Sequence, residues 1–412
     1  MHLAGTRKAK REDSLPPPPE RSLCRGYGGW RSADAELGRR LAMVLAATLG
    51  STACATLPGD LVGRCGKAPA ISVADEVAST DLRVMTYNIE GLPWPARVNR
   101  QPFLDEIGRQ LAQQRAQGIA ADIVLIQEAF SGAAGRTISL AGYANRARGP
   151  TVSSPRAVPS ADAPAALTGK RKVVRGEGLG PLLSGGLYIL SDYPITARAS
   201  RPFRRAECAG FDCLAEKGVQ WAQIRIPGVP SPVDVFNTHL QSRGAAGVSS
   251  NRSFQAHRLQ VNEVSRFISA FRAADHPMIF GGDFNMRTSE KRFEHFELAK
   301  PWPLVHRYCA DRTVDCRVLA SWDGDAPWMD TQDLLGFDDG AIVKIRPIQV
   351  ETRFDQPWRG RPLADHDALL VTYRLSWRTS AMPHHSGGLT SGTCSGRSWL
   401  HRLTSTSSKH SR

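Results

Sequence analysis

Short apolar stretches that end in polar or turn-forming residues recur along the chain and predict β-strands. They are residues 82–89, 121–128, 185–195, 218–226, 233–240, 278–282 and 367–375. Residues 102–118 and 257–274 instead carry apolar side chains at helical spacing, and residues 145–181 are rich in Pro, Gly, Arg and Ala, which predicts a long surface loop. No glycine-rich nucleotide-binding turn follows the first strand. We therefore expect mixed sheets packed together with helices outside.

The two ends of the chain differ in composition from this body. Residues 1–36 have the charges and prolines of a disordered segment, and residues 37–55 combine arginines, a short apolar run and a small-residue cleavage site. That order resembles a secretory signal peptide, with a mature apolar helix as the alternative; the run is too short to span a bilayer. Residues 56–77 would be a linker, residues 78–376 one folded domain and residues 377–412 a disordered tail.

Eight cysteines are compatible with export. Cys208 with Cys213, and Cys309 with Cys316, form two close pairs without the spacing of a zinc site. In an oxidising compartment each pair most simply forms a local disulfide, whereas four reduced thiols would suit a cytosolic protein. We expect a secreted or periplasmic location, with a lipid anchor through Cys54 as a variant, because Ser51 to Cys54 loosely resembles a lipoprotein box.

The formal net charge of +14 is concentrated at the ends. Residues 1–40 hold nine Lys and Arg against five Asp and Glu, and residues 376–412 hold five against none. The body is therefore mildly basic. Such a charge is compatible with an anionic or phosphate-bearing partner but selects none.

Polar side chains that can bind a metal ion or transfer a proton stand at five predicted strand boundaries. They are Asn88, Glu128, His239, Asp283 with Asn285, and Asp365 with His366. Each alone has an ordinary structural explanation, such as a turn, a helix cap or a hydrogen-bonded strand histidine. Five such boundaries in one chain are hard to explain by packing.

The blocks TYNIEGLP, DIVLIQE, GGLYILSDYPI, NTHLQS, GGDFN and ADHDALL resemble, in sequence and order, the endonuclease/exonuclease/phosphatase superfamily. The resemblance implies an α+β fold, a four-layered αββα sandwich of two mixed β-sheets flanked by helices (DNase I-like). Within that superfamily, bacterial neutral sphingomyelinases are similar to this chain in two blocks, CLAEKGVQWAQI and NTHLQS. The resemblance also implies phosphodiester hydrolysis, which requires charge neutralisation at the phosphoryl oxygens, an activated water and a stabilised leaving oxygen.

Metal binding would fall to Glu128, because hard divalent cations prefer carboxylate oxygen, with Asn88 adding a neutral oxygen. The expected cofactor is Mg²⁺ or another divalent cation such as Mn²⁺ or Co²⁺. Such an ion polarises the phosphate and stabilises the leaving alkoxide. His239 would donate a hydrogen bond to the charge that develops on the phosphoryl group.

The expected general base is His366, whose tautomer and basicity would be set by Asp365 or a nearby carboxylate. By resemblance, Asp283 also helps to hold His366 or the attacking water, and Asn285 positions the phosphate.

Two positions depart from the family pattern. Ala364 replaces the Ser that usually precedes the Asp-His pair, so one hydroxyl that could brace the site is missing. The Asp of the family's penultimate strand corresponds most closely to Asp333, with Asp330 as the alternative.

We predict a secreted, metal-dependent phosphodiesterase that acts on a phospholipid at a membrane surface, most simply cleaving sphingomyelin to ceramide and phosphocholine. Trp322, Trp328 and Trp358 are candidates for membrane contact, or alternatively packed core or lid residues. A secreted nuclease with the same catalytic residues is the second hypothesis, because a basic body suits a polyanion. A binding module that has lost catalysis is the third. No obligate protein partner is evident.

Overall fold

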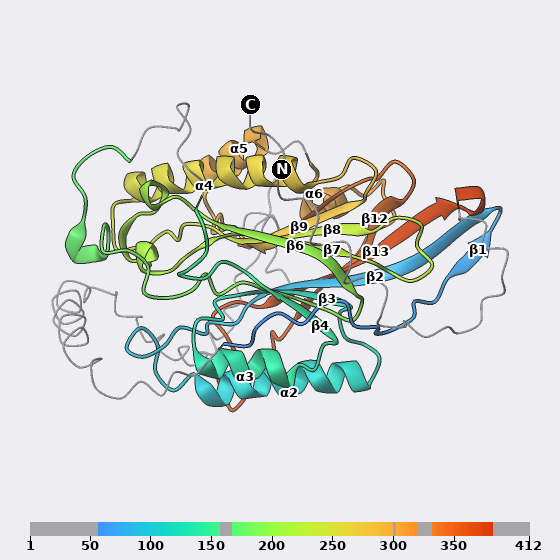
Figure 1. Cartoon of the computed structure of the whole chain (residues 1–412), viewed down its shortest axis with the longest axis horizontal. Helices are drawn as coiled ribbons and strands as arrows, with labels where there is room; N and C mark the ends of the chain where they lie inside the picture. The colour runs from blue at the N-terminus through green and yellow to red at the C-terminus, as the bar shows by residue number, and fades with distance from the viewer. Residues whose placement is uncertain (1–56, 157–166, 300–301, 320–331, 382–412) are drawn as a thin grey trace, which may run out of the picture. The chain divides into compact units, whose positions relative to one another are not determined.

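The computed structural model describes residues 57–156, 167–299, 302–319 and 332–381, and these residues form four layers (Figure 1). Two β-sheets face each other in the middle. Helices α2 (Gln101–Ala116) and α3 (Gly132–Leu140) cover one sheet, and α4 (Ser250–Phe271) and α5 (Glu290–Ala299) cover the other. The expected αββα sandwich is confirmed.

The larger sheet has eight strands in the described part of the chain, in the order β10-β12-β13-β2-β3-β5-β4 with β1 added beside β2. Their bounds are β1 Ser72–Ala74, β2 Val77–Asn88, β3 Ile123–Gln127, β4 Asn145–Arg148, β5 Tyr188–Ser191, β10 Arg317–Leu319, β12 Lys344–Arg353 and β13 Ala368–Arg378. β2 and β3 are parallel, as are β10 and β12, whereas the other neighbours are antiparallel, so the sheet is mixed.

The smaller sheet has five strands in the order β11-β9-β8-β7-β6. Their bounds are β6 Ile195–Pro202, β7 Gly218–Ile224, β8 Val233–His239, β9 Met278–Asp283 and β11 Asp333–Asp338. β8 and β9 run parallel, and α4 is the crossover between them. Short helix α6 (Val305–Ala310) lies against β11 and β12.

Three apolar clusters fill the spaces between the four layers. The cluster between the sheets includes Val84 and Leu125 from one sheet and Val235 and Ile279 from the other. A second cluster joins the larger sheet to α2 and α3, and a third joins the smaller sheet to α4 and α5. The strands of a sheet covered on both faces need apolar side chains on both faces, which explains the continuous apolar runs of the sequence.

Polar contacts also cross between the sheets, deep in this core. The Gln127 side chain donates a hydrogen bond to Asn237 Oδ1 over 2.8 Å, and the Asn237 amide donates to the carbonyls of Ile126 and Tyr188. Gln127 and Asn237 are fully buried. Gln127 directly precedes Glu128, and Asn237 stands two residues before His239. The hydrogen bonds between them therefore fix the two sheets relative to each other close to Glu128 and His239.

The glycine at position 282 is required by the close approach of β8 and β9. Its φ is +137°, and a Cβ there would lie 2.0 Å from the Thr238 carbonyl oxygen. A side chain at this position would therefore push apart the parallel strands that end in His239 and Asp283.

Several boundaries differ from the sequence-based expectations. Helix α4 begins at residue 250 rather than 257, because Ser249 caps it by accepting a hydrogen bond from the Arg252 amide. β4 lies inside the predicted loop, where Asn145 is held by the backbone of Arg64. The expected linker instead packs on the domain: Leu61 pairs with Arg146, and β1 pairs with β2.

The signal-peptide-like segment, Cys54, Trp322, Trp328 and Asp330 lie outside the described residues. Strand β13 and the 3₁₀ helix η4 (Thr379–Ala381) extend the ordered body slightly beyond the expected end at residue 376. Among the helices that the structure describes, none combines the length and apolar character needed to cross a bilayer.

The two expected disulfides are present, Cys208–Cys213 and Cys309–Cys316. Each closes a loop of only a few residues, with separations of 5 and 7. Loop-closure entropy then contributes about 2 kcal/mol per bond to the free energy of unfolding. We expect mass spectrometry of the non-reduced protein to find both pairs linked, and reduction to lower the melting temperature. Free thiols at all four positions would contradict this expectation.

Candidate active site

The polar strand ends meet at one edge of the sandwich because of strand direction. Three of these residues, Asn88, His239 and Asp283, end β2, β8 and β9, and Glu128 directly follows β3. Because β2 and β3 are parallel, as are β8 and β9, the ends of each pair lie at the same edge. The two sheets touch here: the Asn88 amide donates to Asp283 Oδ2 over 3.0 Å. Antiparallel strands β7, β11 and β13 begin at the same edge and bring further polar residues.

Asn88 links the partly buried carboxylate of Glu128 and the buried carboxylate of Asp283. Its Nδ2 donates to Glu128 Oε1 over 3.1 Å as well as to Asp283, while its Oδ1 accepts from the Glu90 amide over 3.1 Å. The structure differs here from the expected oxygen contribution of Asn88 to a metal. Two neighbouring carboxylates repel each other and need a donor between them, which the amide nitrogen supplies.

Glu128 has two features that mark a functional carboxylate. Its backbone φ is +59°, a left-handed conformation that a non-glycine residue adopts at a cost. Burial raises the pKa of Glu128 to about 7, against the opposing effects of the Lys217 charge and the Asn88 hydrogen bond. Burial likewise raises the pKa of Asp283 to about 6. Both carboxyl groups therefore gain from a nearby cation when they ionise.

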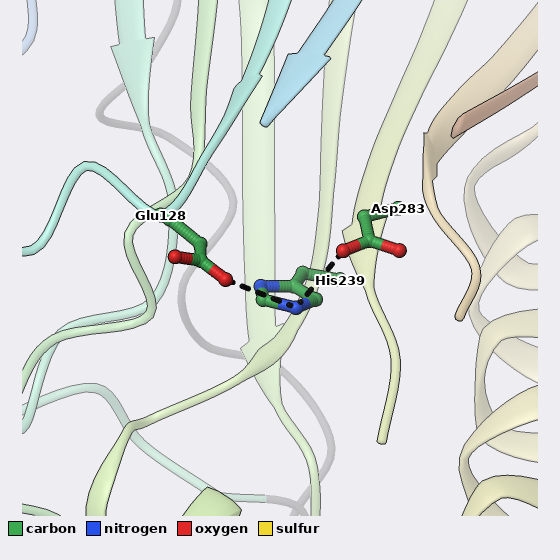
Figure 2. Close-up of side chains that lie close together, drawn as sticks. All are labelled: Glu128, His239 and Asp283. Carbon is green, nitrogen blue, oxygen red and sulfur yellow. Dashed lines mark ion pairs between the residues drawn. The ribbon is translucent and has the colours of Figure 1, made fainter. Parts of the chain in front are cut away.

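His239 lies between Glu128 and Asp283 (Figure 2). Its Nε2 is 3.4 Å from Asp283 Oδ2 and 4.0 Å from Glu128 Oε1. Nε2 is also 3.0 Å from Lys217 Nζ. Burial, with the positive charges of Lys217 and His366, holds the pKa of His239 well below its usual value. A neutral imidazole accepts at Nε2 from the Lys217 ammonium and carries its proton on Nδ1, which is buried without a hydrogen-bond partner among the described residues.

The group Glu128, His239 and Asp283 has the composition of a metal site, with one ligand atom of each within 4.8 Å of the others. The carboxylates fit a hard cation such as Mg²⁺, which binds oxygen. His239 fits less well, because the Lys217 ammonium faces the nitrogen that would bind. The oxygen-rich side of the group, Glu128 with Asp283, could therefore hold such a cation.

His366 is paired with Asp333, one of the two aspartates between which the sequence left the choice open. Its Nδ1 is 2.5 Å from Asp333 Oδ2, and its Nε2 is 2.7 Å from the Gln332 amide nitrogen and 4.0 Å from Asp283 Oδ2. Burial acts to lower the pKa of His366, but the charge and hydrogen bond of Asp333, and the charge of Asp283, raise it well above the usual value.

Asp365 points away from this group, in contrast to its expected role beside His366. Its carboxylate is half-exposed and 3.2 Å from Arg97, and its backbone amide donates to Glu90. The chain bends at Asp365 and His366, and the two side chains have different partners, Arg97 and Asp333. Asp333 takes the expected place of Asp365.

Asn285 lies next to the site and is held by backbone contacts. Its side-chain amide donates to the Leu240 carbonyl over 3.1 Å, and its own backbone amide donates to Asp283 Oδ1 over 2.9 Å. A φ of +52° suits Asn better than most residues. This turn orients the Asp283 carboxylate.

The sequence analysis missed Lys217 and Asp212 as site residues. Lys217 is buried, and its ammonium contacts Asp212 Oδ2 over 3.1 Å and the Leu240 carbonyl over 3.2 Å, in addition to His239. A signal was present, since Lys217 stands directly before β7, and the start of an antiparallel strand lies beside the end of its neighbour, here β8.

Comparisons of sequence agree with this arrangement. The model of the endonuclease/exonuclease/phosphatase family matches residues 85–366, which include Asn88, Glu128, His239, Asp283 and His366. Curated relatives include sphingomyelinases of Mycobacterium bovis and Mycobacterium tuberculosis, each 25% identical over 228 residues. That alignment covers 55% of this chain but only 38% of each relative.

Solved structures show the same fold. The beta toxin of Staphylococcus aureus superposes with a TM-score of 0.50 at 18% identity, over 70% of this chain and 99% of the toxin. A mutant of that toxin, crystallised with bound magnesium ions, superposes with a TM-score of 0.50 over 71% of this chain and 99% of its own. At this identity the likeness establishes the fold.

Proposed function

The chain belongs to the endonuclease/exonuclease/phosphatase family, and on that premise we propose that it is a divalent-metal-dependent phosphodiesterase that cleaves a phospholipid. Sphingomyelin, hydrolysed to ceramide and phosphocholine, is the proposed substrate. The observation that carries the proposal is the convergence of two carboxylates, a His–Asp pair and a lysine-bound histidine at one edge of the sandwich.

In the proposed reaction the neutral form of His366 removes a proton from the attacking water, and Asp333 stabilises the imidazolium that forms. Because Asp333 also raises the pKa of His366 well above its usual value, activity should rise with pH as the neutral form is populated. The 2.5 Å contact with Asp333 holds His366 through Nδ1, and the Gln332 side chain, 2.7 Å from Nε2, would have to move aside for the water. Asp283, 4.0 Å from that nitrogen, is close enough to accept a second hydrogen bond from the same water.

Glu128 and Asp283 would hold the cation, which when bound polarises the phosphoryl oxygens and stabilises the leaving alkoxide. Lys217 adds a positive charge that remains inside the site. His239 would donate its Nδ1 proton to the charge that develops on the phosphoryl group, a role that requires this buried nitrogen to become accessible when the substrate binds. Asn88 holds the two carboxylates in place from between them.

The test compares sphingomyelin, phosphatidylcholine and double-stranded DNA as substrates, with Mg²⁺ and with EDTA. We expect Mg²⁺-dependent release of phosphocholine from sphingomyelin and little cleavage of DNA. The sphingomyelinase relatives favour this outcome over nuclease activity. Preferred cleavage of DNA would support the nuclease hypothesis, and no hydrolysis of any substrate would support the inactive binding module.

Metal affinity should depend steeply on pH. The pKa of Glu128 is about 7 in the metal-free protein, so protons compete with the cation as the pH falls. We expect the dissociation constant for Mg²⁺ to rise about tenfold for each pH unit below 7 and to level off above it. Isothermal titration calorimetry at pH 6, 7 and 8 measures this. A dissociation constant independent of pH in that range would argue against Glu128 as a ligand.

A further inference from the structure

An exposed basic loop lies next to the active site and is not explained by the proposed chemistry. We call residues 170–182 the docking loop; it contains the 3₁₀ helix η1 (Val173–Arg175). Four of its residues are basic, Lys170, Arg171, Lys172 and Arg175, and its single acid is Glu177. In Figure 1 this segment lies at the left, at the end of the body opposite β1.

The docking loop exposes its apolar side chains to solvent. Val173 is 52% exposed and Val174 is 88% exposed, while Leu179 and Leu182 are 55% and 63% exposed. Isolated exposed apolar residues are ordinary on a protein surface. Four of them within ten residues, beside a cluster of cations, are not.

A buried ion pair holds the base of the docking loop in place. Glu177 is buried and accepts two hydrogen bonds from Arg252 of α4, over 2.7 and 2.6 Å. It also accepts from the backbone amides of Lys172 and Gly210. Although burial opposes ionisation, these hydrogen bonds lower the pKa of Glu177 to about 2. The pairing with Arg252 also removes Glu177 as a partner for the loop's own cations.

The docking loop packs against the 3₁₀ helix η3 (Gly210–Leu214), which reaches into the site. The amides of Leu182 and Leu183 donate to the Leu214 carbonyl over 2.7 and 3.0 Å. Asp212, also in η3, holds the Lys217 ammonium beside His239. Only one short element therefore separates the loop from the catalytic residues.

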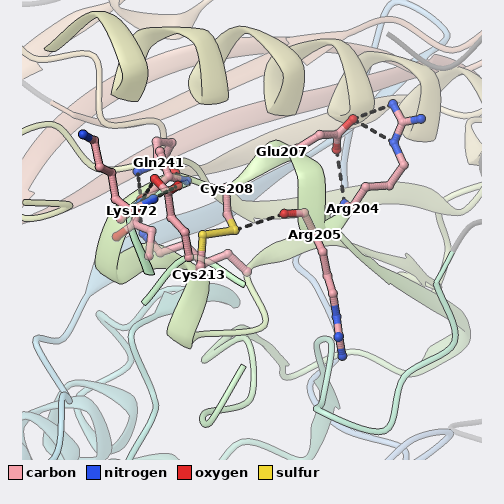
Figure 3. The surroundings of a disulfide bond; sticks show 12 residues. Lys172, Arg204, Arg205, Glu207, Cys208, Cys213 and Gln241 are labelled. Carbon is pink, nitrogen blue, oxygen red and sulfur yellow. Dashed lines mark hydrogen bonds and ion pairs between the residues drawn. A yellow bond between two sulfur atoms is a disulfide. The ribbon is translucent and has the colours of Figure 1, made fainter. Parts of the chain in front are cut away.

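Further positive charge lies beside the docking loop. Arg205 of η2 (Arg205–Glu207) is next to the loop, since a Cβ built on Gly180 would lie 3.7 Å from its guanidinium. Figure 3 shows the Arg205 and Lys172 side chains extending away from the Cys208–Cys213 disulfide on different sides. The cations of the loop and Arg205 can contact lipid headgroups while the exposed apolar side chains of the loop enter the bilayer boundary.

We propose that the docking loop binds the surface of a bilayer that contains anionic phospholipid, with Val173 and Val174 entering the headgroup region. The proposal builds on the proposed phospholipid substrate. Four cations without a competing acid match a negative surface, and the exposed valines and leucines favour a lipid surface over a nucleic acid, whose phosphates offer them no apolar contact. The anchored base presents the loop in one conformation, so little conformational entropy is lost on binding.

Vesicle sedimentation tests the proposal without requiring turnover. We expect the protein to bind vesicles of phosphatidylcholine with phosphatidylserine more tightly than vesicles of phosphatidylcholine alone, and the difference to shrink with added NaCl. The triple variant Lys170→Gln, Arg171→Gln, Lys172→Gln should bind the anionic vesicles about 100-fold more weakly, at about fivefold per charge. Val173→Ser with Val174→Ser should weaken binding about tenfold.

Matched controls remove the same charge or apolar surface elsewhere. The control for the charge variant is Arg109→Gln with Arg136→Gln and Lys291→Gln, at positions on the outer helices α2, α3 and α5. The control for the valine variant is Val62→Ser with Val73→Ser, at positions outside the docking loop. Controls that weaken vesicle binding as much as the loop variants would overturn the proposal, as would wild-type protein that binds both vesicles equally. Loop-dependent binding of an oligonucleotide without vesicle binding would also overturn it.

Hydrolysis of the soluble diester bis(p-nitrophenyl) phosphate separates this proposal from the proposed function. The loop variants should keep wild-type turnover of this substrate and the wild-type melting temperature. If the protein hydrolyses no diester but still binds anionic vesicles through the loop, the proposed function fails and the docking site stands. If the protein hydrolyses sphingomyelin but the loop variants bind vesicles as tightly as the wild type does, the docking site fails and the proposed function stands.

Discussion

Glu128→Gln should lower phosphodiester hydrolysis by about 1,000-fold at limiting Mg²⁺, because the variant keeps the shape of the side chain but removes its charge. Glu128 is a partly buried carboxylate with a raised pKa, and Asn88 donates to it and to Asp283, the other candidate ligand. Part of the activity should return at high Mg²⁺. The measurement is initial rate as a function of Mg²⁺ concentration.

The control for this variant is Glu106→Gln on helix α2, which removes the same charge from a surface ion pair with Arg109. It should have wild-type activity at every Mg²⁺ concentration. The melting temperature of the metal-free Glu128→Gln protein should equal or exceed that of the wild type, since burying the charged group is costly. Wild-type turnover by Glu128→Gln at limiting Mg²⁺ would show that the cation is held elsewhere.

His366→Ala should lower kcat by about 100- to 10,000-fold, the usual contribution of a general base. Asp333→Asn should cause a loss of the same order, because an amide can keep the contact with His366 Nδ1 but cannot stabilise an imidazolium. Residues that act as one unit are not additive, so the double variant should be little worse than either single one. Single-turnover hydrolysis by variants with normal melting transitions measures these effects.

The chain contains a matched control at the opposite end of the same strands. His276 precedes β9, and its Nδ1 lies 3.2 Å from Asp234 of β8, so it also forms a His–Asp pair. His276→Ala should leave kcat unchanged. If Asp333→Asn keeps wild-type kcat whereas Asp365→Asn loses it, the assignment of the supporting carboxylate reverts to the one that the sequence suggested.

The strand ends were predictable from sequence because they combine two strong signals. A buried strand is apolar throughout, so a polar residue at its end is conspicuous, and parallel neighbours end at the same edge. This logic correctly placed Asn88, Glu128, His239 and Asp283 together. The four-layered fold followed from the family resemblance of the same blocks and not from periodicity alone.

The residues at strand starts were harder to predict. Lys217 and Asp333 reach the site through antiparallel pairing, and sequence distance does not reveal which strands pair. Asp365 was favoured because it adjoins His366 in sequence, but its half-exposed carboxylate is paired with Arg97. Asp333 instead lies in β11 opposite Asp283. The choice between them depends on a tertiary contact that no local pattern encodes.

Local polarity also concealed some elements. The first seven residues of α4 are mostly polar, and they join the helix because Ser249 caps it and because the buried Arg252 is paired with Glu177. Strand β4 has little apolar surface of its own and is held by the side chain of Asn145. Both depend on partners far away in the sequence.

The buried amide link between Gln127 and Asn237 bears on which partly folded states can be active. Glu128 and Asn88 belong to one sheet and His239 and Asp283 to the other, so neither half of the sandwich carries a complete set of reactive groups. A collapsed intermediate with both sheets formed but not docked would have native-like secondary structure and no turnover. Hydrolysis would therefore report the docking of the sheets during refolding.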